Sequence, residues 1–149
     1  MRFPASFMSS ALSLARAASE LGEVPIGAVV VKDGKIIAEG HNETRDQNDP
    51  TAHAEIVAIR RAAAALGDDR LTGCDLWVTL EPCAMCAGAI AHARIARLYY
   101  AASDPKGGAV EHGARVFEQE QCLHRPEVYS GLGEEEAADM LRGFFRERR

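Results

Sequence analysis

The sequence predicts an α/β protein, a three-layer α/β/α domain built on a mixed sheet over residues 1–149. Short β-rich segments alternate with helical segments in the middle of the chain, which implies crossover connections and parallel neighbouring strands. An Asp-Gly pair near the start predicts an antiparallel hairpin beside them. With 47% hydrophobic and 26% charged residues, a chain of 149 residues has the composition and the length of one domain with a real core.

The first segment, up to about residue 21, predicts an amphipathic helix. Its first 19 residues contain arginines and serines but no acid, which also resembles an organelle transit peptide. A regular apolar face favours a helix that belongs to the fold. We therefore expect a cytoplasmic protein, and no apolar run is long enough to predict a membrane span. The residues of the apolar face are Phe7, Ala11, Leu14, Ala15, Ala18 and Leu21.

The next elements are a hairpin and a helix. Residues 25–31 and 35–42 predict two strands, joined by a tight turn at 32–35. Residues 43–50 are polar and predict a loop. A helix is expected from about Thr51 to Leu66, with Asp49 or Thr51 as its cap and Gly67 just past its end.

The second half continues the alternation. Residues 75–80 predict a third strand, and a helix is expected from Pro82 to about Arg94, since proline suits the first turn of a helix. Residues 97–102 predict a fourth strand, and 127–129 a short fifth strand. Residues 103–126 fit no single element. A last helix is expected over about 133–149, which makes the predicted sheet five-stranded.

The charge is unevenly distributed. The chain carries a net charge of −5, which argues against a protein that grips nucleic acid over its whole surface. Residues 142–149 nevertheless contain four arginines and one acid. A basic end of this kind can bind a phosphate backbone locally. The helix dipole also favours this charge order, because Glu134–Glu136 open the same segment, and from the charge alone we prefer this interpretation.

Two fragments carry the chemistry of a metal site. His53 and Glu55 form one, and Cys83 and Cys86 form the other. An imidazole and two thiolates are three zinc ligands, and three protein ligands leave a fourth position open, as in catalytic zinc sites. His-x-Glu followed by Pro-Cys-x-x-Cys is the signature of the zinc nucleobase deaminases. Glu55 is then the general acid/base, and a zinc-bound water is the nucleophile.

The spacing within each fragment restricts the geometry. Cys83 and Cys86 are three residues apart at a helix start, so both thiols fall on one side. His53 and Glu55 are two apart and can serve one site only from the first turn of a helix. We therefore predict that two helix N-termini converge on the metal. Zinc with two thiolates and a neutral imidazole has no net charge, so its water needs a nearby base, which Glu55 supplies.

Other interpretations of these residues are open. A Cys-x-x-Cys pair at a helix start also occurs in thiol oxidoreductases, which predicts reversible oxidation and no stoichiometric zinc. A zinc-stabilised binding module is a further alternative, and it predicts a closed fourth position. Cys74 and Cys122 lack partners at ligand spacing and are expected to be small buried apolar residues.

Longer stretches around these motifs resemble the bacterial tRNA-specific adenosine deaminases, within the wider cytidine deaminase-like superfamily. The similar stretches are Asp49–Ile56 and Val78–Ala89, together with Glu23–Val29, Ala93–Ile95, Asp104–Ala109 and Phe144–Arg146. The zinc motifs alone indicate only the superfamily. The flanking stretches and the Phe-Phe-Arg ending point to the tRNA enzymes.

The resemblance implies a cytidine deaminase-like sandwich, a homodimer with one Zn²⁺ per subunit, and conversion of adenosine to inosine at the wobble position of a tRNA anticodon, typically of an arginine tRNA. It implies substrate contacts by Asn42 and, near the anticodon loop, by Asp104 and Lys106. Each of these also suits an ordinary loop or turn. The candidate RNA-binding residues are those of the C-terminal segment, namely Phe144, Phe145, Arg146, Arg148 and Arg149.

The sequence departs from the resemblance at residues 111–126, where many family members carry a histidine-rich stretch. The main rival function keeps the chemistry and changes the substrate to a free base or nucleoside, such as guanine, cytosine or cytidine. That rival needs no basic C-terminal segment. The helix after Pro82 is apolar almost all round, which fits either core burial or a subunit interface.

Overall fold

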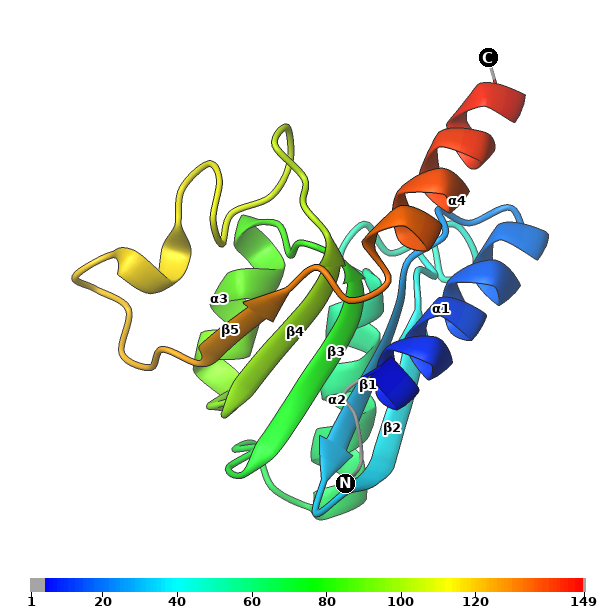
Figure 1. The fold of residues 1–149 in the computed structure, drawn as a ribbon. Coiled ribbons are helices and arrows are strands. Elements are labelled where there is room, and N and C mark those ends of the chain that lie inside the picture. The colour runs from blue at the N-terminus through cyan, green and yellow to red at the C-terminus, as the bar shows by residue number, and fades with distance from the viewer. Residues whose placement is uncertain (1–4, 149) are drawn as a thin grey trace.

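The computed structural model describes residues 5–148 and contains a five-stranded mixed sheet between two layers of helices (Figure 1). The strand order is β2-β1-β3-β4-β5, with β1 antiparallel to both of its neighbours and β3, β4 and β5 parallel. The predicted α/β class and mixed sheet are confirmed. The strands are β1 Gly27–Lys32, β2 Lys35–His41, β3 Cys74–Leu80, β4 Arg97–Ala102 and β5 Glu127–Ser130.

Four α-helices cover the sheet. Helices α2 and α3 pack on one face, and α1 and α4 pack on the other. Neighbouring residues of β1 show the alternation that separates the two cores, since Val30 faces α2 and α3 whereas Val29 faces α1 and α4. The helices are α1 Ala5–Glu20, α2 Ala54–Leu66, α3 Ala84–Ala93 and α4 Glu134–Glu147, with a short 3₁₀ helix η1 at Val116–Glu118 in the long connection between β4 and β5.

The first helix forms as predicted, but part of its predicted buried face is wrong. Met8 and Leu12, which lie outside the predicted apolar face, are buried against the sheet. Leu21 is 70% exposed, because α1 ends at Glu20 and the chain turns away at Gly22, whose φ is +81°.

The two helices that begin near the candidate ligands start later than predicted. Helix α2 begins at Ala54 and not at Thr51, since the Asp49 carboxylate accepts the Thr51 N–H at 2.9 Å and closes a separate turn. Helix α3 begins at Ala84, so Pro82 lies before the cap and not in the first turn. The predicted end of α2 at Gly67 and the hairpin turn at Asp33-Gly34 are confirmed.

The close approach of α2 to β2 depends on Gly40. A Cβ added there would lie 2.8 Å from the carbonyl oxygen of Ala54 in the first turn of α2. Glycine therefore brings the start of α2 down onto the sheet, directly beside the candidate ligand His53. Among residues 5–148, no helix combines the length and the hydropathy of a membrane span.

Candidate metal centre and active site

The N-termini of α2 and α3 lie next to each other, which confirms the predicted convergence. His53 is the residue before the first residue of α2, and Cys83 is the residue before the first residue of α3. Both have extended backbone conformations, and neither side chain caps its own helix. The two side chains are therefore free to turn toward a shared point beyond the helix ends.

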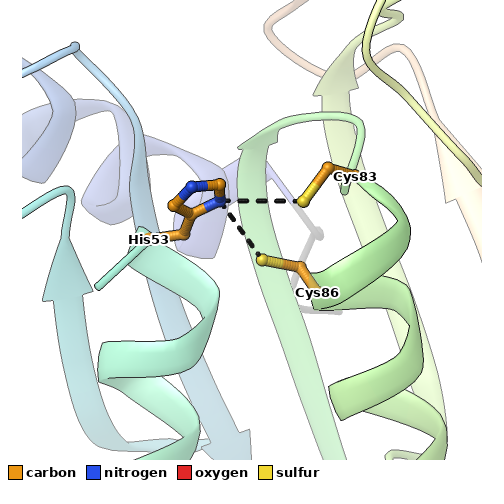
Figure 2. Close-up of side chains that lie close together, drawn as sticks. All are labelled: His53, Cys83 and Cys86. Atoms are coloured by element: carbon orange, nitrogen blue, oxygen red, sulfur yellow. Dashed lines mark hydrogen bonds between the residues drawn. The ribbon is translucent and has the colours of Figure 1, made fainter. Parts of the chain in front are cut away.

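Figure 2 shows His53, Cys83 and Cys86 pointing toward one another. The Nδ1 atom of His53 lies 3.7 Å from Sγ of Cys83 and 3.6 Å from Sγ of Cys86. Zinc bonds of about 2.3 Å to sulfur and about 2.0–2.1 Å to nitrogen, at tetrahedral angles, separate the nitrogen and sulfur by about 3.5–3.6 Å. The spacing and the donor types of these three side chains fit a tetrahedral zinc ion.

The pKa values of the two thiols shift in opposite directions. Hydrogen bonds with Cys86 and then with His53 lower the pKa of Cys83 to about 3. The same hydrogen bond with Cys83, together with burial, raises the pKa of Cys86. The lowered pKa favours the thiolate form of Cys83, and a bound cation would favour the thiolate form of Cys86 as well. The positive ends of two helix dipoles add to this preference for negative charge.

Glu55 lies in the first turn of α2, beside the three ligands. Its side chain is buried, with 4% of the residue exposed. Burial, partly offset by a hydrogen bond with its own backbone, raises the pKa of Glu55 to about 7. A carboxyl group with a pKa near neutrality can both accept and donate a proton, which suits general acid/base work.

Asn42 directly follows β2. Its neighbour Glu43 donates its backbone N–H to the carbonyl of Ala52, at 2.9 Å, directly before His53. The Oδ1 atom of Asn42 is buried and has no hydrogen-bond partner within residues 5–148. A buried acceptor without a partner costs about 1–3 kcal/mol, so this oxygen is a candidate for contact with a ligand.

Asp104 and Lys106 line a surface cavity of about 590 Å³ between α4 and the ends of β3 and β4. Phe145 and Arg146 of α4 line the same cavity. The structure thus places together two candidate substrate-binding residues and two candidate RNA-binding residues. The Asp104 carboxylate accepts the backbone N–H of Lys106 at 3.2 Å, which closes a turn at this point.

Phe144 of α4 and Arg148 directly after this helix do not line this cavity and instead pack against each other. Phe144 is 6% exposed, and the guanidinium of Arg148 covers its ring at 3.7 Å, whereas Phe145 is 51% exposed. Phe144 therefore packs inside the protein, and its contact with RNA stays a prediction. Arg149 lies outside the described residues.

Two buried carboxylates next to the site were missed by the sequence reasoning. Glu23 accepts the backbone N–H groups of Arg45 and Asp46 in the loop after Asn42. Glu81 accepts N–H groups from the connection after β4. Burial alone would raise the pKa of Glu81, but the hydrogen bonds that it accepts outweigh burial and lower its pKa. The available signal for Glu81 was an acidic residue at the end of a mostly apolar stretch before Pro82.

The comparisons with known proteins agree with this geometry. The sequence profile of the MafB19-like deaminases matches residues 4–149. A protein of Agrobacterium fabrum named tRNA-specific adenosine deaminase is 64% identical over 143 residues, which cover 96% of this chain and 94% of that protein. A solved structure from studies of A-to-I editing by tRNA:A34 deaminases is 62% identical, with a TM-score of 0.90, and covers 91% of this chain and 99% of its own.

A second solved structure is that of a guanine deaminase from Bacillus subtilis. It is 48% identical, with a TM-score of 0.67, and covers 68% of this chain and 66% of its own. The fold and the arrangement of His53, Glu55 and the two cysteines define a deaminase. Within that class, the chain belongs to the family of tRNA-specific adenosine deaminases.

Proposed function

We propose that this protein is a zinc-dependent hydrolase that converts adenosine to inosine at the wobble position of a tRNA anticodon, with an arginine tRNA as substrate. The observation that carries the proposal is the convergence of His53, Cys83 and Cys86 beside the buried carboxyl of Glu55. A tRNA substrate is supported by relatives named tRNA-specific adenosine deaminase, one of them 64% identical over nearly the whole chain, and the wobble position by the similar solved structure from studies of A-to-I editing.

In this proposal His53, Cys83 and Cys86 hold one zinc ion per subunit. When bound, zinc with three protein ligands keeps one position for water and lowers the pKa of that water. His53 offers Nδ1 to the ion, since that nitrogen faces both sulfurs. The buried Cys86 and the half-buried Cys83 supply the two negative charges that neutralise the ion.

Glu55 is the proposed proton shuttle. Its carboxylate takes a proton from the attacking water and delivers it to N1 of the adenine while a carbon–oxygen bond forms at C6. It then passes the second proton of that water to the amino group, so that the carbon–nitrogen bond breaks and ammonia leaves. Burial excludes bulk water from this carboxyl, so the transferred protons stay among the attacking water, the adenine and Glu55.

Asn42 is the proposed contact to the nucleoside. Its buried Oδ1 lacks a partner within the described chain, and a donor group of the substrate would satisfy it. We infer that Asn42 orients the target nucleoside, which must leave the base stack to reach the site. An anticodon loop allows this at modest cost, because its bases are not paired.

The cavity beside α4 is the proposed contact for the anticodon loop. Asp104 and Lys106 form one wall, and Phe145 and Arg146 form another. An exposed aromatic ring can stack on an unpaired base, and an arginine can bind a phosphate. The predicted RNA-binding role of the C-terminal segment is proposed for Phe145 and Arg146, with Arg148 and Phe144 as packing support.

We also propose that two copies associate as a homodimer through α3. This helix exposes apolar residues, namely Ala84 and Met85, at its N-terminal end. An exposed methionine beside small residues allows a close helix contact. Light scattering after size-exclusion chromatography should give twice the mass of 16.1 kDa, and Met85→Glu should shift the protein toward the monomer. A wild-type monomer at micromolar concentration would refute this part.

Guanine deamination is the rival function, since a guanine deaminase is among the similar structures. The test compares ammonia release from an arginine anticodon stem-loop, free adenosine, guanine and cytidine. We expect release from the stem-loop, with a higher KM for the double variant Phe145→Ala and Arg146→Ala. Glu147→Ala on the same exposed helix end is the control. Ammonia from guanine but not from the stem-loop would refute the proposed substrate.

A further inference from the structure

The carboxylate of Glu81 is enclosed by one segment of the chain, residues 104–112. Its side chain has no exposed surface. Oε1 accepts the backbone N–H of Asp104 at 3.0 Å and lies 2.8 Å from Nδ1 of His112. Oε2 accepts the backbone N–H groups of Val110, Glu111 and His112 at 3.1, 2.9 and 3.1 Å. Both ends of the segment are therefore attached to one side chain.

The segment is folded closely around this carboxylate. Three successive N–H groups on one oxygen form the kind of concavity that binds anions in other proteins. Ala109 also donates its N–H to the carbonyl of Pro82 at 2.8 Å. A Cβ added to Gly108 would lie 2.5 Å from Cδ of Glu81, so only glycine fits there.

Glu81 connects two parts of the proposed site. On one side it precedes Pro82 and the ligand Cys83, at the end of β3. On the other side it holds Asp104, whose turn carries Lys106 and lines the cavity beside α4. With all of its contacts made to protein groups and no exposed surface, Glu81 is not placed to exchange protons with a substrate.

We propose that Glu81 is a positioning residue that fixes segment 104–112 against the metal-ligand turn, so that Asp104 and Lys106 keep their place in the substrate wall. The effect on catalysis rests on the proposed function, whereas the attachment of the segment does not. Glu81 acts through its backbone partners and not by contact with the reacting atoms. Its loss should therefore weaken substrate binding more than the chemical step.

The first test is Glu81→Gln, which keeps the size but replaces one acceptor oxygen with an amide NH₂. One orientation turns the NH₂ toward the backbone N–H of Asp104, and the other turns it toward the three backbone N–H groups of Val110, Glu111 and His112. We expect unchanged zinc stoichiometry, while amide hydrogen exchange at Asp104 and Val110–His112 becomes at least about tenfold faster. In the same variant, KM for the arginine anticodon stem-loop should rise about tenfold, with kcat within about threefold of wild type.

Two further variants test the same contact more mildly and provide a control. His112→Ala removes only the imidazole contact and should raise KM in the same direction by about twofold to threefold, which tests the anchor even where Glu81→Gln folds poorly. Asp68→Asn is the matched control, because the Asp68 carboxylate accepts the N–H of Arg70 at 3.0 Å in an exposed turn after α2. It should change neither the exchange at 104–112 nor KM.

The possible results distinguish the attachment of segment 104–112 to Glu81 from its effect on substrate binding. Unchanged exchange at 104–112 in Glu81→Gln would refute the anchor. Faster exchange with an unchanged KM in the folded, zinc-loaded variant would assign Glu81 a purely structural role and overturn the positioning proposal. If the wild-type protein releases no ammonia from the stem-loop, the proposed function fails, and the exchange data still decide whether Glu81 holds the segment.

Discussion

Removal of zinc should lower the stability of this protein measurably, because the three proposed ligands bridge the N-termini of α2 and α3. His53 and Cys83 are 30 residues apart in the chain and belong to different helix starts. Among residues 5–148, they form with Cys86 the group whose ligand atoms lie within 4.8 Å of one another. A ligand that binds only the folded state stabilises it by mass action.

The size of the effect follows from that linkage. Free zinc at about 100 times its Kd adds about 2.7 kcal/mol to the free energy of unfolding. In a domain of roughly 150 residues each kcal/mol corresponds to about 2–4 °C, so chelation should lower Tm by about 5–11 °C. Removing one ligand should abolish this zinc-dependent shift.

The assay is thermal unfolding at a series of buffered zinc concentrations, with metal content measured on the same samples. His53→Ala should lose both bound zinc and the zinc-dependent rise in Tm. Cys122→Ala is the matched control, since Cys122 is a thiol outside the proposed ligand set and donates to the carbonyl of His124. Full zinc content in His53→Ala, or its loss in Cys122→Ala, would refute the assigned ligand set.

Three further predictions concern packing, charge and RNA contact. Ile90→Ala removes a side chain that has no exposed surface and lies between α3 and the sheet. Chemical denaturation should therefore show a free energy of unfolding lower by about 2–5 kcal/mol. A decrease below about 1 kcal/mol would contradict this packing. Burial raises the pKa of Asp75 above 3.8 despite Arg97, so its ionised form disfavours folding above that pH. Asp75→Asn should therefore have a Tm at pH 7 equal to or higher than that of wild type, and the difference in Tm should vanish in acid. A large drop in Tm at pH 7 would contradict the unfavourable burial of the Asp75 carboxylate. Arg146→Ala should lower the slope of log K against log salt for stem-loop binding by about 1, whereas an unchanged slope would exclude a phosphate contact.

Local sequence rules found the elements because these depend on short spacings, and they found the metal group because each of its two fragments has a characteristic short spacing. Cys83 and Cys86 lie three residues apart, and the Asp33-Gly34 pair fixes a hairpin through its own backbone preference. Helix starts were placed less well. Asp49 looks like a helix cap in the sequence, but its carboxylate closes a turn with Thr51, and the helix begins only after His53.

The missed features depend on contacts between distant residues. Glu81 binds groups that lie 23 to 31 residues later in the chain, within a stretch that fits no single element. No local pattern encodes that pairing. The burial of Phe144 similarly depends on how α4 packs and on Arg148, so the sequence could not separate it from the exposed Phe145.

We propose that this chain deaminates one adenosine of a tRNA with Glu55 as the proton shuttle. The most direct measurement is the inosine content of an unmodified arginine tRNA, read position by position after incubation with wild-type protein and with Glu55→Ala of equal zinc content. We expect inosine at the wobble position alone with wild type, and none with the variant. Inosine formation that persists in Glu55→Ala, or its absence with folded, zinc-loaded wild type, would contradict it.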